Sequence, residues 1–163
     1  MARVAIVMGS DHDLPVVEKA ISCLKDLKVE YEVRVISAHR SPEACAFFSR
    51  SAEENGFGAI IAAAGKAAHL AGAIAANTVL PVIGIPVKSS TLDGLDALLS
   101  TVQMPSGMPV ATVAIDGAEN AAILAAQILA NGDPELRARL KEKRRKALQA
   151  IEEADKRVNE QFK

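Results

Sequence analysis

The sequence predicts an α/β domain in which helices cover both faces of a parallel sheet. Short runs rich in β-branched residues alternate with longer Ala- and Leu-rich segments, which is the pattern of βαβ units. Several of the short runs are apolar at consecutive positions, as in strands that are buried on both faces. The chain has 163 residues, half of them apolar, which suits one domain with a full core. We therefore expect a three-layer αβα sandwich over residues 1–163.

Five strands are expected in this sheet. Each is a short run of Val, Ile or Ala that is bounded by polar, Gly or Pro residues. The runs are residues 4–8, 31–36, 59–63, 82–85 and 110–115.

A capping residue followed by proline marks the start of the first two helices. Asp13 and the proline two residues later predict a helix over 14–27. Ser41 repeats this arrangement for a helix over 42–55, and Gly56 can adopt the left-handed conformation that ends it.

Three further helices complete the predicted sheet domain, and a fourth follows it. A short helix begins near His69, and residues 93–103 and 118–130 form the next two. Asp133, followed by proline and glutamate, caps a last helix that reaches about residue 160. The sheet core thus spans 1–131.

The last helix differs in character from the others. Residues 132–163 carry ten basic and seven acidic side chains, a net charge of +3. The basic run at 141–146 could suggest nucleic acid, but interleaved glutamates together with Leu140, Leu148 and Ile151 favour an amphipathic, exposed helix. Because this helix outlasts the sheet, we expect it to pack on a neighbouring subunit.

Composition excludes several classes of protein. The chain has no Trp, four Phe and one Tyr, and its 19 basic and 20 acidic residues nearly cancel, so a base-stacking or polyanion-binding protein is not expected. Lys66 and His69 interrupt the most apolar stretch, 59–76, which excludes a membrane span. The N-terminus lacks a secretory signal, so a cytoplasmic protein is expected.

Two features of the packing follow from residue type. Cys23 and Cys45 lie among apolar neighbours without ligand spacing, so buried free thiols are expected in place of a disulfide or a zinc site. The Ala-rich stretches 59–76 and 118–130 provide few large side chains, so oligomerisation is expected to complete burial.

The three histidines all lie in loops that follow predicted strands. His12 follows the first strand, His39 the second and His69 the third. In an open parallel sheet, ligands bind outside the carboxyl ends of the strands. We therefore expect these loops to converge on one ligand site.

The first two of these loops have the chemistry of an anion site. Gly9, the Ser10 hydroxyl and the amides of a helix N-terminus suit a phosphate, and Arg40 adds a forked cation. Asp13 can accept hydrogen bonds from sugar hydroxyls. Neither a Walker loop nor a three-glycine dinucleotide motif occurs, so a nucleotide monophosphate is favoured. Taken singly, Ser10 and Asp13 could be helix caps, and Arg40 could be a surface ion-pair partner.

His39 is the candidate acid and base, because imidazole exchanges protons near neutral pH and this one lies beside Arg40. His69 begins a helix and is expected to orient or hydrogen-bond a ligand. His12 is equally consistent with a solvent-facing loop residue. Two Gly- and Pro-rich stretches, 81–87 and 103–110, could close over a ligand or form subunit contacts, and composition leaves both readings open.

Five motifs in order carry a family resemblance. They are Gly-Ser-x-x-Asp at 9–13, Ser-Ala-His-Arg-Ser-Pro at 37–42, Ala-Ala-His-Leu at 67–70, Pro-Val-Ile-Gly-Ile-Pro-Val at 81–87 and Val-Gln-Met-Pro-Ser-Gly at 102–107. Over about residues 2–131 the chain resembles the N5-carboxyaminoimidazole ribonucleotide mutase family of purine biosynthesis, in its microbial class I form.

The resemblance implies a flavodoxin-like fold, a homo-octamer with sites at subunit junctions, and no metal or organic cofactor. It implies transfer of a carboxylate from N5 to C4 of aminoimidazole ribonucleotide, with carbon dioxide held in a closed site. By position, His39 would shuttle the proton. The phosphate and ribose would be held by Ser10, Asp13 and Arg40. The base and carboxylate pocket would be lined by Ser37, Ala64, Gly65, His69 and Leu70.

Four positions depart from the family pattern. This chain has His12, Ser41, Lys66 and Ala71 where the family usually has Ser, Thr, Gly and Pro. His12 and Lys66 each add a bulky group to a substrate loop, where it could supplement anion binding or obstruct it. We expect Lys66 to point outward or to pair with a carboxylate.

Three alternatives to the mutase reaction stay open on sequence. One is direct carboxylation of aminoimidazole ribonucleotide by carbon dioxide. Another is a noncatalytic nucleotide-binding oligomer whose site is inactivated by His12 and Lys66. A flavodoxin-type electron carrier is disfavoured, because few aromatic residues are available to stack on a flavin.

Overall fold

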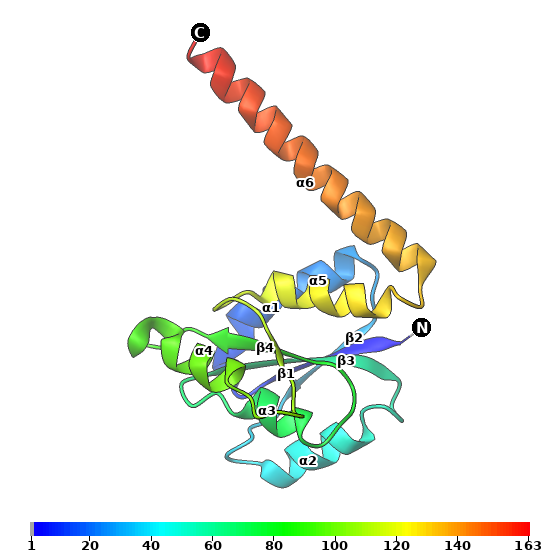
Figure 1. Ribbon diagram of the computed structural model, residues 1–163, viewed down its shortest axis with the longest axis vertical. Coiled ribbons are helices and arrows are strands. Elements are labelled where there is room, and N and C mark those ends of the chain that lie inside the picture. The colour runs from blue at the N-terminus through cyan, green and yellow to red at the C-terminus, as the bar shows by residue number, and fades with distance from the viewer. Residues whose placement is uncertain (1) are drawn as a thin grey trace.

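The computed structural model describes residues 2–163, so Met1 of the expected domain lies outside the described residues. Five parallel strands form one sheet in the order β2-β1-β3-β4-β5. Helices lie on both sides of it (Figure 1), which confirms the three-layer αβα fold. The strands are β1 (Arg3–Met8), β2 (Tyr31–Val35), β3 (Phe57–Gly65), β4 (Val82–Val87) and β5 (Ala111–Thr112).

Alternate residues of the central strands feed two separate hydrophobic clusters. In β1, Ile6 faces the cluster formed with α1 and α5, whereas Val7 faces the cluster formed with α2 and α3. Cys23 and Cys45 are buried free thiols, one in each cluster, as expected, and burial raises the pKa of both. The helices are α1 (Leu14–Asp26), α2 (Pro42–Ser51), α3 (Leu70–Ala75), α4 (Leu95–Val102) and α5 (Ala118–Leu129).

The expected helix caps are only partly correct. Asp133 caps the last helix by accepting from the Leu136 amide at 2.9 Å, as expected. Asp13 makes no capping hydrogen bond, because a 3-10 turn, Asp11–Asp13, already precedes α1 and is capped by the Ser10 hydroxyl. Ser41 also caps nothing; its Oγ donates to the Ser37 carbonyl at 2.9 Å and closes the loop before α2.

Two helices differ from their expected lengths. α2 ends at Ser51 and continues as a turn to Gly56, whose φ of +79° confirms the expected left-handed stop. α4 begins two residues later than expected, because Asp93 has a φ of +52° and interrupts the helical conformation.

The fifth strand is much shorter than expected. Only Ala111–Thr112 pairs with β4, whereas the apolar run extends over 110–115. The reason lies in β4, where Pro86 has no N–H to donate to a neighbouring strand. Beyond it the chain keeps only isolated bonds, such as that from the Asp116 amide to the Pro86 carbonyl.

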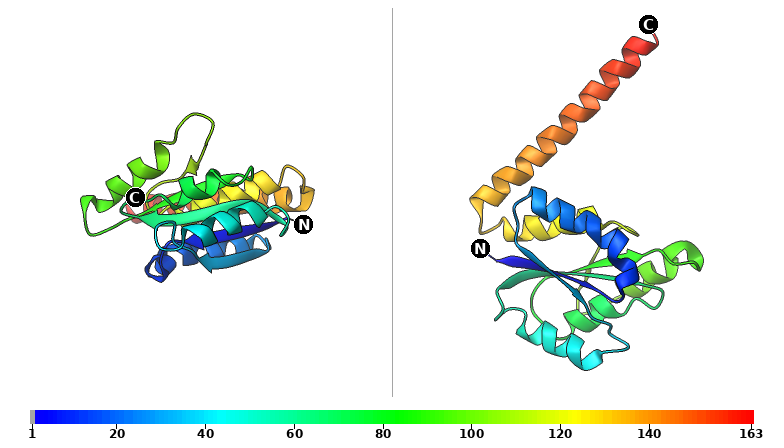
Figure 2. Two further views of the ribbon diagram at one scale, coloured as in Figure 1. Left: turned by 90° about the horizontal axis from the view of Figure 1, so that it is seen from below. Right: turned by 180° about the vertical axis from the view of Figure 1, so that it is seen from behind.

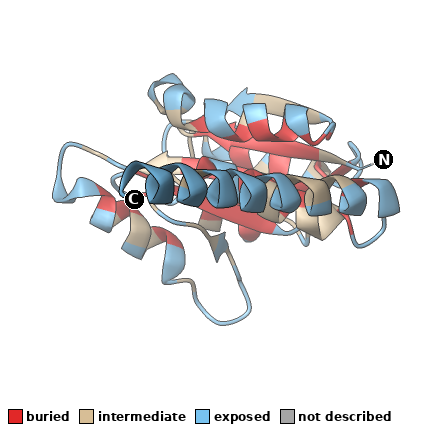
Figure 3. Cartoon of the chain, turned by 90° about the horizontal axis from the view of Figure 1, so that it is seen from above, coloured by how far each residue is buried: buried red, intermediate tan, exposed pale blue. Residues whose placement is uncertain are grey.

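The last helix, α6 (Pro134–Gln161), leaves the sheet domain soon after it begins (Figures 1 and 2). Its first turns are attached through buried Leu136 and through Arg139, whose Nε donates to the Leu27 carbonyl at 2.7 Å. Most of its length is exposed (Figure 3), including Ile151, which is 69% exposed. None of the helices in residues 2–163 has both the length and the apolar character needed to cross a bilayer.

Candidate active site

A cavity of about 580 Å³ opens at the carboxyl ends of β1 to β4. The sequence prediction that the three histidine-bearing loops converge is therefore confirmed. Every candidate site residue lines this cavity: Ser10, His12, Asp13, Ser37, His39, Arg40, Ala64, Gly65, Lys66, His69 and Leu70.

Sequence reasoning named the stretch 81–87 but missed Lys88 and Ser89, which follow it. Val87, Lys88 and Ser89 also line the cavity. The signal was available, since these residues end a buried strand at the same edge of the sheet. The ammonium of Lys88 is engaged, because its Nζ lies 3.1 Å from Oδ1 of Asp93.

Arg40 joins the first two loops. Its Nη2 donates to the Gly9 carbonyl at 3.0 Å, and its backbone amide donates to Ser37 Oγ at 3.1 Å. Within residues 2–163 the guanidinium forms no ion pair, so this part of the chain gives no support to the reading as a surface ion-pair partner. Its charge remains available for an anionic ligand.

The first loop offers fewer free amides than its sequence suggested. The Gly9 amide already donates to the Ala63 carbonyl at 3.1 Å, and the His12 amide donates to Ser10 Oγ at 3.3 Å. Nδ1 of His12 lies 2.9 Å from the same hydroxyl, and 91% of its side chain is exposed. The Ser10 hydroxyl donates to Oδ1 of Asp11 at 3.2 Å, so anion binding here depends chiefly on the Arg40 cation.

Asp13 lines the cavity and makes no capping hydrogen bond. Burial raises the pKa of its carboxyl, an effect that a hydrogen bond from the Ser10 backbone and the nearby His12 partly oppose. A half-buried carboxylate in this position can accept hydrogen bonds from the hydroxyls of a ligand.

His39 and His69 form a hydrogen-bonded pair across the cavity. Nε2 of His39 lies 2.7 Å from Nδ1 of His69, with the rings 4.8 Å apart and tilted by 76°. One of these nitrogens must donate and the other accept, so a single proton is held between the rings. His69 thus fixes the orientation of His39, a contact that joins the loop after β2 to the start of α3.

The turn after β3 carries Lys66 and is tied to α4. The Ala68 amide donates to Ser100 Oγ at 3.2 Å, and this hydroxyl donates to the Asp96 carbonyl at 2.6 Å. Lys66 is exposed and makes no ion pair within residues 2–163, so the expected carboxylate partner is absent from this part of the chain.

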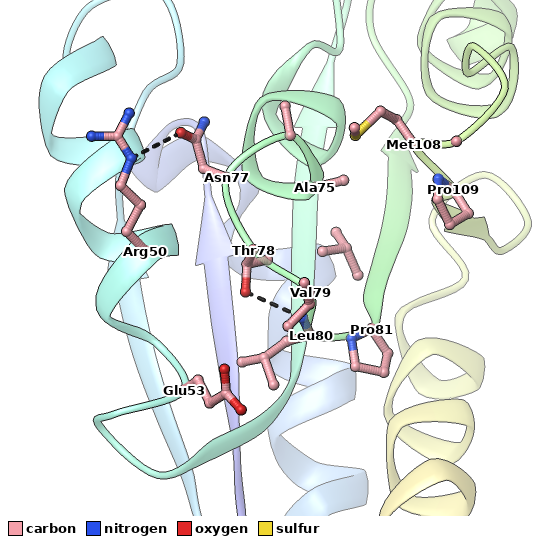
Figure 4. Close-up of a pocket in the computed structure, with 13 residues that line it drawn as sticks. Arg50, Glu53, Ala75, Asn77, Thr78, Val79, Leu80, Pro81, Met108 and Pro109 are labelled. Carbon is pink, nitrogen blue, oxygen red and sulfur yellow. Dashed lines mark hydrogen bonds between the residues drawn. The ribbon is translucent and has the colours of Figure 1, made fainter.

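Two larger cavities lack this concentration of functional groups. One of about 960 Å³ lies at the amino end of β4 and is lined mainly by apolar residues such as Val79, Leu80 and Met108 (Figure 4). Its Arg50 is hydrogen-bonded to Asn77 (Figure 4). The other, of about 1020 Å³, lies between α6 and the ends of α1 and α5. Neither contains a histidine. Within residues 2–163, no group of three His, Cys, Asp or Glu side chains could hold a metal ion.

Comparisons with known proteins identify relatives of this chain. The model of a family described as AIR carboxylase matches residues 3–150. The N5-carboxyaminoimidazole ribonucleotide mutase of Pyrococcus abyssi is 58% identical over 144 residues, covering 88% of this chain and 83% of its own. That of Escherichia coli K12 is 55% identical over 146 residues, covering 88% and 86%.

Two other proteins extend the comparison. A phosphoribosylaminoimidazole carboxylase of Ogataea methanolica is 56% identical over 131 residues, which are 80% of this chain and 24% of that protein. The crystal structure of Treponema denticola PurE superposes with a TM-score of 0.89 at 31% identity, covering 97% of this chain and 99% of the other.

Proposed function

We propose that this chain, which belongs to the AIR carboxylase family, is an isomerase of purine biosynthesis. It moves the carboxylate of N5-carboxyaminoimidazole ribonucleotide from N5 to ring carbon C4. The observation that carries the proposal is the 580 Å³ cavity, in which an anion-binding loop and a hydrogen-bonded histidine pair meet.

The phosphate and ribose occupy the side of the cavity formed by the first two loops. Arg40 holds the phosphate, because its guanidinium lies in this cavity and forms no ion pair within the described residues 2–163. The Ser10 hydroxyl joins it by exchanging its hydrogen bond to Oδ1 of Asp11, now 3.2 Å long, for one to the phosphate. The Asp13 carboxylate accepts from ribose hydroxyls. Hydrogen bonds from the bound nucleotide then add to the one from the Ser10 backbone in offsetting the desolvation of this carboxylate.

The aminoimidazole base lies against the end of β3 and the start of α3. Ala64, Gly65 and Leu70 provide a small, largely apolar surface for the ring, and Ser37 and His69 provide polar atoms at its edge. This arrangement leaves His39 beside the atoms that react, since its ring is held against His69.

The reaction needs one proton moved in each direction. As the N5–carboxylate bond breaks, carbon dioxide leaves and His39 gives a proton to N5. C4 of aminoimidazole ribonucleotide then attacks the carbon dioxide, and His39 takes the proton that C4 loses, so the enzyme returns to its starting state. The hydrogen bond to His69 keeps the imidazole oriented through both steps.

Retention of carbon dioxide requires a closed site. The open cavity of one chain is completed, in this proposal, by neighbouring subunits of a homo-octamer. The Gly- and Pro-rich segment 103–110 of the same chain does not close it, because Gly107, Met108 and Pro109 line the cavity at the amino end of β4. The exposed part of α6 packs on such a neighbour, which would cover Ile151 and Leu148, 69% and 58% exposed in the single chain. We place the octamer in the cytoplasm, in keeping with its biosynthetic role.

Substrate choice separates the mutase from a direct carboxylase, the activity named for the Ogataea methanolica relative. Purified protein is assayed with each nucleotide at low and at high bicarbonate, and formation of the C4-carboxylated product is followed. Product from N5-carboxyaminoimidazole ribonucleotide supports the mutase. Product only from aminoimidazole ribonucleotide at high bicarbonate would favour the carboxylase, and binding without turnover would favour the noncatalytic reading.

A further inference from the structure

We propose that Lys66 determines specificity by binding the carboxylate of both substrate and product, so that the site selects carboxylated nucleotides over the uncarboxylated one. This inference rests on the proposed function. The ammonium group of Lys66 forms no ion pair within residues 2–163.

The backbone at Lys66 does not account for a lysine. Its φ is +52°, in the left-handed region that glycine and asparagine adopt more readily than lysine does. The turn itself is fixed by other contacts, including the bond from the Ala68 amide to Ser100 Oγ at 3.2 Å and that from the His69 amide to the Ala67 carbonyl at 2.9 Å. The backbone therefore gives no reason for a lysine at this position, and the side chain starts from a turn that these contacts hold.

Two lysines line the cavity, and in the described part of the chain Lys66 is the one that has no ion-pair partner. Lys88 is paired with Asp93 at 3.1 Å. Arg40, the third strong cation of the cavity, donates to the Gly9 carbonyl and lies on the side of the β1 and β2 loops. Because β1 lies between β2 and β3 in the sheet, the Lys66 turn after β3 is separated by one strand from the loop after β2 that supplies Arg40.

This separation of cations fits the two anionic groups of the substrate. The phosphate is assigned to Arg40, so the carboxylate must lie near the histidine pair, where His39 can reach both N5 and C4. His69 belongs to the same turn as Lys66, three residues later. Lys66 is therefore the free ammonium nearest to the reacting carboxylate.

The chemistry of the transfer predicts which kinetic constant Lys66 controls. N5 is attached to C5, the ring neighbour of C4, so the carboxylate moves only between adjacent positions and one flexible lysine can contact it in both. Carbon dioxide, the species between them, is neutral and gains little from the ammonium. An interaction that stabilises substrate and product but not the intermediate lowers KM and does not raise kcat.

The test compares binding of two nucleotides by isothermal titration calorimetry. The probes are aminoimidazole ribonucleotide and its C4-carboxylated product, and the variant is Lys66→Asn, which accepts a positive φ. Loss of one charge-assisted hydrogen bond should weaken binding of the carboxylated nucleotide about tenfold and that of the other less than about twofold. In turnover, KM for N5-carboxyaminoimidazole ribonucleotide should rise about tenfold while kcat stays the same or rises, because the lost interaction stabilised the bound substrate more than the intermediate. Lys66→Arg should restore most of the lost affinity.

Lys28→Asn is the matched control, because Lys28 is an exposed lysine with a φ of +55° that lies outside this cavity. It should leave both affinities unchanged. Lys66→Gly, which relieves the backbone strain, should repeat the loss and exclude misfolding as its cause.

Equal weakening of both nucleotides, or a fall in kcat at constant KM, would overturn the assignment of Lys66. So would unchanged affinity for the carboxylated nucleotide. A parent protein that binds this nucleotide through Lys66 but has no turnover would instead refute the proposed function and leave the assignment standing.

Discussion

Gly9 and Gly65 both line the cavity, yet replacing each with alanine should have opposite consequences. At Gly65, an added Cβ would lie 3.1 Å from the Val87 carbonyl oxygen and 3.7 Å from its Cβ. Val87 is the β4 residue paired with Gly65, so this carbonyl is held by the sheet and cannot move aside. At Gly9, an added Cβ would meet only the Ala63 carbonyl at 4.0 Å, an ordinary contact.

The magnitudes follow from these contacts. Gly65→Ala should cost about 1–3 kcal/mol of unfolding free energy through overpacking, which lowers Tm by about 3–10 °C for a domain of this size. Gly9→Ala should leave Tm unchanged or slightly higher, since its φ is not in the left-handed region and alanine restricts the unfolded chain. Its methyl group would instead occupy space proposed for the phosphate and raise KM about tenfold or more.

Thermal unfolding by calorimetry and steady-state turnover of N5-carboxyaminoimidazole ribonucleotide would measure both effects. The reasoning requires that Gly65→Ala change stability and that Gly9→Ala change KM without loss of stability. A Gly9→Ala protein with the parent KM would refute the placement of the phosphate beside the first loop. A Gly65→Ala protein with the parent Tm would refute the close packing of β3 on β4.

Three further predictions test other parts of the account. Because burial raises the pKa of Asp13, ionisation of its carboxyl opposes folding at neutral pH, and Asp13→Asn should raise Tm at pH 7. The gain in Tm should shrink to nothing as the pH falls toward 3.8, the ordinary pKa of the carboxyl. A gain in Tm that stays constant with pH would contradict this. Arg40→Lys should raise KM about tenfold because the forked contact is lost, and unchanged KM would argue against a phosphate at Arg40. Ile151→Asp should reduce the oligomer measured by light scattering while circular dichroism stays unchanged, and an intact assembly would contradict packing of α6 on a neighbour.

The buried strands and the site were predictable because each depends on a short-range pattern. Consecutive apolar residues locate the central strands, and the rule that ligands bind at the carboxyl ends of parallel strands brings His39 and His69 together. Contacts between distant residues were not predictable in detail. The hydrogen bond between the two histidines joins residues 30 positions apart, and no local pattern indicates it.

The wrong expectations have a common physical origin in competition between neighbours. The run at 110–115 has the composition of a strand, but its pairing is limited by Pro86 in the adjacent strand. Asp13 and Ser41 have the chemistry of caps, but a preceding 3-10 turn and a loop contact make those caps unnecessary. In each case a tertiary or adjacent contact overrides the preference of the single residue.

The most direct measurement is turnover of N5-carboxyaminoimidazole ribonucleotide at low bicarbonate by the parent protein and by His39→Asn. We expect the parent to form the C4-carboxylated product, and His39→Asn to be slower by about 10²–10⁴-fold, the usual contribution of a general acid and base, with nucleotide binding retained. A parent protein that leaves this substrate unchanged, or a His39→Asn variant as fast as the parent, would contradict the proposal that this cavity transfers the carboxylate through His39.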